Sequence, residues 1–222
     1  MKYRSVFDII GPIMVGPSSS HTAGAVRIGL LTRYIFGYQP EKIKITLYGS
    51  FKETYKGHGT DIALIGGLLG YNTSDKRIRT SLENAKEAGI DFEFIESEVE
   101  HIHPNTAKLE VKTGRHSLDL VGKSIGGGKM IIFELLGFDV NLSGDFPSYF
   151  IFYKFNESNK VQLLSEVEAI FGNNKVSTNF SDSILEGTNL LVVETLEEIS
   201  EEQLEKITKL GYVNEVKFAD RL

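Results

Sequence analysis

Three short segments of the chain concentrate side chains that can transfer protons or bind an anion. The sequence GPSSSHT covers residues 16–22, KGHGTD covers residues 56–61, and HIHPN covers residues 101–105. The first two segments come directly before apolar stretches with helical spacing. The backbone N–H groups at the start of a helix lack partners and lie at the positive end of the helix dipole, so they favour a carboxylate or a phosphate. Both segments therefore suit the binding of a small anion.

The hydroxyl groups of the first segment have two possible roles. Ser18, Ser19, Ser20 and Thr22 could all donate hydrogen bonds to a bound anion. Alternatively, one serine caps the following helix and the others are solvated. Because serine is so frequent at helix N-caps, the second interpretation is favoured for any single serine taken alone.

The histidines of these segments are the candidates for proton transfer. The chain has five histidines: His21, His58, His101, His103 and His116. His58 stands between Gly57 and Gly59, and glycine allows a backbone to approach a ligand closely. A neutral imidazole near pH 7 can accept or donate a proton, so His58 and His103 are candidate general acids or bases. Residue type alone does not distinguish this role from that of surface-loop histidines, and His116, in an expected hairpin turn, is assigned to the surface.

Composition excludes several classes of protein. The 222 residues include no cysteine, which excludes disulfides, thiolate nucleophiles and any iron-sulfur or zinc-thiolate centre held by this chain alone. No GxSxG, P-loop or HExxH motif occurs, and no basic patch with interleaved aromatic residues indicates nucleic-acid binding. The N-terminus lacks a signal-peptide pattern, and no apolar run approaches the roughly 20 residues of a membrane helix. We expect a cytoplasmic protein.

The first part of the chain has the pattern of an α/β unit. Helices are expected after SSSHT up to Gly37, over DIALIGGLLG from Thr60 or Asp61, and over residues 75–88. Strands are expected at residues 43–48, at DFEFIE, TAKLEVK and SLDLVG, and after the glycine loop of SIGGGK. The intervening GSFKETYKGHG is expected to be a polar loop.

The last part of the chain has a different pattern and a different charge. It predicts strand 149–155, helix 159–171, strands 175–181 and 189–195, helix 200–210 and strand 212–218. This βαββαβ order is typical of the ferredoxin-like arrangement, in which two helices cover one face of a four-stranded antiparallel sheet. Residues 147–222 hold 13 acidic and 7 basic residues, whereas residues 1–146 hold 17 of each. With LSGDFPS as the linker, we expect domains at 1–146 and 147–222.

Four motifs together carry a family resemblance. GPSSSHT, YGSFKETYKGHGTD, HPN and SIGGG, in this order and spacing, resemble the β chain of bacterial iron-sulfur-dependent L-serine dehydratase, the two-chain form. The resemblance covers residues 3 to about 140, and the βαββαβ unit resembles the ACT domain that two-chain enzymes carry. It implies one subunit of a heteromeric L-serine ammonia-lyase that forms pyruvate and ammonia, in amino-acid catabolism and gluconeogenesis, and that is inactive without its α chain.

The resemblance also implies a cofactor and a set of site residues. The α chain would carry a 4Fe-4S cluster with one iron not ligated by cysteine, acting as a Lewis acid without pyridoxal phosphate, and this chain would hold no metal. His58 and His103 match positions of catalytic histidines. The positions that match the substrate-binding residues are Ser18, Ser19, Ser20, His21, Thr60 and Asn105. Ser50 and Lys52 belong to the second motif as well.

A second resemblance gives an alternative function. The first unit is also similar to the allosteric substrate-binding domain of some phosphoglycerate dehydrogenases, which lies next to an ACT domain, so the chain could be an amino-acid-sensing regulatory module. Proton-transfer groups in all three segments favour catalysis, since a sensor does not need them. The turn FNESNKVQ at residues 155–162 lacks the glycine usual in amino-acid-binding ACT domains. We therefore expect this unit to pair with another copy rather than bind a ligand.

Overall fold

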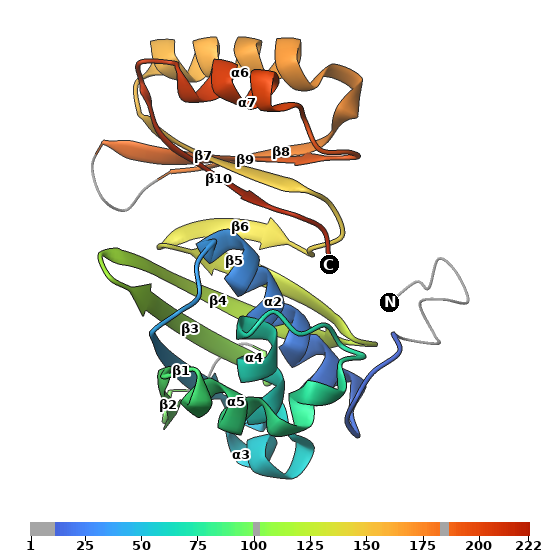
Figure 1. Cartoon of the computed structure of the whole chain (residues 1–222). Coiled ribbons are helices and arrows are strands. Elements are labelled where there is room, and N and C mark those ends of the chain that lie inside the picture. The colour runs from blue at the N-terminus through green and yellow to red at the C-terminus, as the bar shows by residue number, and fades with distance from the viewer. Residues whose placement is uncertain (1–11, 100–102, 183–186) are drawn as a thin grey trace. The chain divides into compact units, whose positions relative to one another are not determined.

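The computed structural model describes residues 12–99, 103–182 and 187–222. The chain divides into two compact units, each with its own sheet (Figure 1). The first unit runs to Leu136 and adds Asn141–Ser143 and Leu222, and the second comprises Gly137–Val140 and Gly144–Arg221. The expectation of a mixed α and β fold with two sheets is confirmed. No helix among the described residues has the length and apolar character needed to cross a membrane.

A six-stranded sheet forms the base of the first unit, in the order β2-β1-β3-β4-β5-β6. The strands are β1 (Lys42–Tyr48), β2 (Asp91–Glu96), β3 (Thr106–Thr113), β4 (His116–Gly126), β5 (Lys129–Leu135) and β6 (Phe138–Leu142). β1 pairs with β2 in parallel and with β3 in antiparallel register, and β3, β4 and β5 continue antiparallel. β6 was not among the strands expected from the sequence, although its residues FDVNL alternate between apolar and polar, which is a strand signal.

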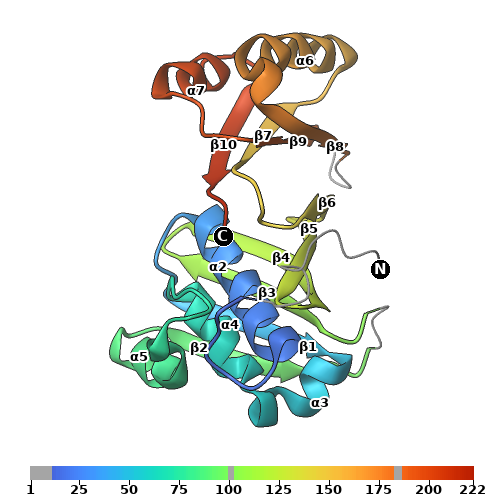
Figure 2. The ribbon, with the colours of Figure 1, turned by 90° about the vertical axis from the view of Figure 1, so that its right-hand side faces the viewer.

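Helices cover one face of this sheet. They are the π-helical turn η1 (Ser19–Ala23), α2 (Gly24–Phe36), α3 (Gly49–His58), α4 (Thr60–Leu68), the 3-10 turn η2 (Lys76–Thr80) and α5 (Ser81–Glu87). Figures 1 and 2 show α2, α4 and α5 on the same side of the strands. α2 ends at Gly37, which has a left-handed φ of 79°, as the sequence predicted. The single helix expected over residues 75–88 is instead η2 followed by α5.

The expected loop GSFKETYKGHG is a helix, and this correction matters for function. Residues Gly49–His58 form α3, and Gly59, with a φ of 69°, separates it from α4. Three glycines and several charged residues in this stretch favoured a loop. Phe51 is the residue of α3 that is fully buried, so the helical apolar pattern was faint. His58 is therefore the last residue of a helix rather than part of a flexible loop.

α2 and α4 cross closely near the C-terminal end of α4. A Cβ atom on Gly29 would lie 2.3 Å from the Leu64 carbonyl oxygen, and one on Gly67 would lie 2.2 Å from the Val26 carbonyl oxygen. Both distances are shorter than real Cβ contacts, so the two backbones approach as closely as they do only because each helix has a glycine at the crossing.

The second unit has the element order that the sequence predicted. It comprises β7 (Ser148–Lys154), α6 (Glu157–Phe171), the 3-10 turn η3 (Gly172–Asn174), β8 (Lys175–Ser181), β9 (Thr188–Thr195), α7 (Glu201–Thr208) and β10 (Val213–Ala219). The sheet order is β10-β7-β9-β8, all pairs are antiparallel, and both helices lie over one face (Figure 1). Aromatic and aliphatic side chains from β7, β9, α6 and α7 form its core.

We expect Gly67→Ala to lower the free energy of unfolding by about 1–3 kcal/mol, because the added methyl group forces the α2 and α4 backbones apart. Circular dichroism during thermal unfolding measures this change. Gly57→Ala is the matched control, since a Cβ at this helical position meets open space and should leave the melting temperature equal or slightly higher. A Gly67→Ala chain that melts like the wild type would contradict the close crossing.

Candidate functional site

The imidazole of His21 lies at the centre of the candidate site. Its Nδ1 atom is 3.0 Å from Ser20 Oγ, and its Nε2 atom is 3.0 Å from Ser50 Oγ. The ring is tilted against that of His58, with centroids 4.9 Å apart, and it meets Phe51 edge-on at 5.5 Å. The first two sequence motifs therefore meet here, with both nitrogens of His21 in hydrogen-bond contact.

The first motif forms a π-helical turn before α2. Ser18 is its N-cap: the Ser18 hydroxyl accepts a hydrogen bond from the His21 backbone N–H at 3.1 Å and lies 3.3 Å from Ser20 Oγ. One serine therefore caps the helix, as expected. Ser18 and Ser20 belong to the hydrogen-bond network around His21, whereas Ser19 is exposed. π-helical turns are rare and occur frequently at functional sites.

Helix α3 presents the second motif to this turn. Ser50, Thr54 and His58 are spaced four residues apart and lie on one face of the helix. The Thr54 hydroxyl donates to the Ser50 carbonyl at 2.7 Å, within the helix. The Thr22 hydroxyl donates to the His58 carbonyl at 2.9 Å, at the end of the helix. The contact of Thr22 with α3 was not expected from the sequence. Had α3 been recognised as a helix, the four-residue spacing would have indicated that Ser50, Thr54 and His58 share one face.

The third motif lies at the other end of α3. The Phe51 backbone N–H donates to the Pro104 carbonyl at 3.3 Å, and a Cβ on Gly49 would lie 2.8 Å from the Pro104 Cα. The Asn105 backbone N–H donates to His103 Nδ1 at 3.3 Å, which leaves the proton of a neutral His103 on Nε2. All three motifs therefore converge on α3, with His103 near its start and the ring of His58 against His21. His101 lies outside the described residues.

The SIGGG motif supports the other three. Its glycines form the hairpin between β4 and β5, where Gly126, Gly127 and Gly128 all have positive φ. The Ser124 backbone N–H donates to the Asn105 carbonyl at 2.9 Å, and Ser124 Oγ is 2.1 Å from where a Cβ of Gly24 would lie. Ser124 therefore positions the third motif and the beginning of α2 at once.

Burial shapes the chemistry of the site. Burial, and to a lesser extent the neighbouring His58, lowers the pKa of His21, so this imidazole is neutral near pH 7. Burial also raises the pKa of the Asp61 carboxyl, although the Ile62 N–H donates to it. Within the described residues, the buried Nδ1 of His58 and the hydroxyl of the fully buried Thr60 have no hydrogen-bond partner. Buried polar groups without partners are unusual in folded proteins and can serve a ligand.

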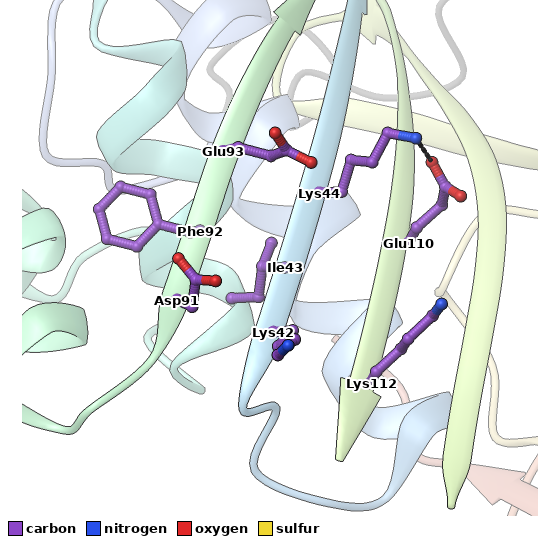
Figure 3. Close-up of a pocket in the computed structure, with 8 residues that line it drawn as sticks. All are labelled: Lys42, Ile43, Lys44, Asp91, Phe92, Glu93, Glu110 and Lys112. Carbon is purple, nitrogen blue, oxygen red and sulfur yellow. Dashed lines mark ion pairs between the residues drawn. The ribbon is translucent and has the colours of Figure 1, made fainter. Parts of the chain in front are cut away.

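A hollow of about 330 Å³ lies elsewhere, over strands β1, β2 and β3 (Figure 3). Its charged lining comes from Lys42, Lys44, Asp91, Glu93, Glu110 and Lys112. Lys44 and Glu110 are cross-strand neighbours and form an ion pair at 3.2 Å. Cross-strand pairs of opposite charge such as this one are usual on a solvated sheet, although Lys42 lies opposite Lys112. The hollow includes none of the predicted site residues.

Comparison with known proteins assigns the family. Over 221 residues the chain is 45% identical to the probable L-serine dehydratase β chain of Bacillus subtilis, in a match that covers 99% of this chain and 100% of that protein. The chain belongs to the L-serine dehydratase β-chain family. The model of the serine dehydratase beta chain family matches residues 5–89, which include the first two motifs.

Two further relatives show how much of other L-serine dehydratases this chain matches. The L-serine dehydratase β chain of Peptoniphilus asaccharolyticus is 41% identical over 152 residues, covering 67% of this chain and 68% of that protein. The L-serine dehydratase of Haemophilus influenzae is 39% identical over 95 residues, which is 39% of this chain but 20% of that protein. Most of the Haemophilus protein therefore lies outside the region that it shares with this β chain.

We expect His21 to titrate below its ordinary pKa of about 6.5, because burial and His58 both disfavour its cation. The shift of the ring Cε1–H resonance with pH in the full chain measures this. His58→Asn should raise the pKa of His21 only in part, because burial remains. A wild-type midpoint at or above the ordinary value would contradict the environment described.

The same shift gives the pH dependence of stability. The unfolded chain binds a proton at His21 more readily than the folded chain, so this residue's contribution falls as the pH drops from the ordinary pKa towards the lower folded pKa. We expect His21→Asn to remove that part of the loss of stability between pH 7 and pH 5. Urea unfolding of both chains across this range measures the difference, and parallel curves would refute it.

Proposed function

We propose that this chain is the β subunit of an L-serine ammonia-lyase that converts L-serine into pyruvate and ammonia together with an α chain. The observation that carries the proposal is the convergence of three motifs on one helix, with an imidazole nitrogen of His58 and the hydroxyl of Thr60 buried and without partners among the described residues. Membership in the L-serine dehydratase β-chain family supports the choice of substrate.

The reaction requires two events at neighbouring carbon atoms of serine. The α-proton passes to a base, and the β-hydroxyl leaves as water after it receives a proton. The enamine that results becomes an imine, which water hydrolyses to pyruvate and ammonia. Both proton transfers suit imidazoles, whose pKa lies near neutral pH.

The iron-sulfur cluster that this reaction class implies does not fit a site on this chain. Cluster ligands are thiolates, and the chain has no cysteine. Within residues 12–99, 103–182 and 187–222, no group of three or more His, Asp or Glu side chains could hold a metal ion. We propose that a 4Fe-4S cluster reaches the site on the α chain, where it supplies Lewis-acid chemistry, and that no pyridoxal phosphate takes part.

The two proposed catalytic histidines differ in their surroundings. His58 has a buried Nδ1 without a partner in the described structure, so this nitrogen suits proton acceptance. His103 accepts the Asn105 N–H at Nδ1, so its neutral ring has Nε2 protonated and suits proton donation. We propose that His58 acts on the α-proton and that His103 assists the leaving hydroxyl.

The proposed substrate-binding residues fall into two groups. The hydroxyl of Thr60, the side-chain amide of Asn105 and the exposed Ser19 are proposed to contact serine directly. Ser18, Ser20 and His21 form a hydrogen-bond network in which His21 also contacts Ser50. We propose that this network supports the site without contacting the substrate. The remaining N–H groups at the start of α4 favour the substrate carboxylate.

We propose that residues 147–222 form an ACT domain and residues 1–146 the serine-site domain of a cytoplasmic heteromer. In the turn before α6, Asn156 accepts a hydrogen bond from the Asn159 backbone N–H at 2.7 Å, and the Asn159 amide donates to the Lys154 carbonyl at 2.8 Å. Backbone groups of this turn are thus hydrogen-bonded to side chains of the same turn. This supports pairing with a second copy rather than amino-acid binding.

We expect His58→Asn and His103→Asn each to lower kcat by about 100-fold or more, the usual contribution of general acid–base catalysis. The assay is anaerobic pyruvate formation from L-serine after this chain is mixed with its α chain. His116→Asn is the matched control, because His116 begins β4 beside a hairpin turn and its ring stacks on that of Tyr38, with centroids 4.5 Å apart. Full activity in either of the first two variants would remove that histidine from the catalytic set.

Calorimetry separates catalysis from amino-acid sensing. If the site is shared between chains, L-serine should bind weakly or not at all to the isolated chain and should bind once the α chain is present. Appreciable binding of L-serine to the isolated chain, with no pyruvate formed by the mixture, would favour the regulatory module instead.

A further inference from the structure

Two adjacent residues hold helix α3 at both of its ends. His21 reaches the first turn of the helix through the contact between Nε2 and Ser50 Oγ at 3.0 Å. Thr22 reaches the last turn through its hydroxyl, which donates to the His58 carbonyl at 2.9 Å. We call His21 and Thr22, with their partner Ser50, the α3 clamp. Both ends of this ten-residue helix therefore contact the same turn before α2.

Thr22, which contacts the C-terminal end of α3, is tightly packed. Thr22 is 1% exposed, and its side chain is packed so closely beneath Gly16 that a Cβ there would lie 2.5 Å from Thr22 Cγ2. The carbonyl that it binds is one of those that a helix end leaves without an intrahelical partner. Because this carbonyl belongs to His58 itself, the bond fixes the backbone from which the imidazole projects.

The N-terminal half of the clamp acts on the same imidazole through ring contact. The Ser50 contact holds the plane of His21, and the ring of His58 lies 4.9 Å away, tilted by 53°. Fully buried Phe51 meets His21 from another side. Thr22 therefore fixes the backbone of His58, and His21 packs against its ring.

We propose that Thr22 and Ser50 are positioning residues for His58: they hold its imidazole at the place where it acts on the substrate, without contacting the substrate themselves. The catalytic part of this inference rests on the proposed function. The placement of His58 against His21 does not, so the two parts are tested separately. Misplacement of a catalytic group by about 1 Å can cost about 100-fold in rate.

The kinetic test uses Thr22→Val, which keeps the shape of the side chain and removes the hydroxyl. In the complex with the α chain we expect kcat to fall about 10- to 100-fold while KM for L-serine changes less than about threefold. Thr22→Ser restores the hydroxyl and should recover most of kcat. Ser50→Ala tests the other end of α3 and should also lower kcat with little change in KM.

Thr32→Val is the matched control. Thr32 is fully buried and donates to the Ile28 carbonyl at 2.7 Å, within its own helix α2. The substitution removes the same kind of hydrogen bond without touching α3, and its kcat should equal that of the wild type. Equal losses in Thr22→Val and Thr32→Val, or wild-type kcat in Thr22→Val, would overturn the proposal.

A second readout does not depend on activity. If Thr22→Val releases His58 from its place against His21, the pKa of His21 measured by NMR in the full chain should rise towards its ordinary value, while Thr22→Ser and Thr32→Val leave it unchanged. An unchanged His21 titration in Thr22→Val would overturn the clamp. If instead the wild-type complex forms no pyruvate, the proposed function fails while the NMR result still decides whether Thr22 positions His58.

Discussion

The contact of one partly buried imidazole with two serines organises the candidate site. His21 lies between Ser20 of its own turn and Ser50 of α3, and a neutral imidazole can donate to one hydroxyl and accept from the other. Burial keeps the ring neutral, so this arrangement is maintained near pH 7. The position of α3, and with it the position of His58, depends on this contact together with the bond from Thr22.

Close backbone packing joins the helices that carry this contact. Gly29 and Gly67 allow the backbones of α2 and α4 to approach closely where the helices cross, near the C-terminal end of α4. Ser124 in the glycine hairpin supports the start of α2 and also binds the carbonyl of Asn105. A site made of short segments is thereby held on tightly packed elements, which is what accurate placement of proton-transfer groups requires.

Two polar groups of this site lack partners among the described residues, which agrees with the proposal that it is completed by another chain. His58 Nδ1 and the Thr60 hydroxyl are buried without partners in the described part of the chain, which costs stability unless a ligand or partner uses them. The charged hollow over β1, β2 and β3 contains the ion pair of Lys44 with Glu110, and its described lining includes none of the residues of the three motifs.

The sequence by itself determined the family motifs, a serine cap before α2, the stop at Gly37 and the βαββαβ order of the second unit, because each follows from local spacing or from the conformational preference of one residue. It also named His58 and His103 as proton-transfer candidates. It did not reveal α3, β6 or the bond of Thr22 to His58. β6 is a short strand that follows β5 directly. α3 and the bond of Thr22 depend on contacts between residues distant in the chain, because α3 has few apolar residues and its Ser50, Phe51 and His58 meet partners from other segments.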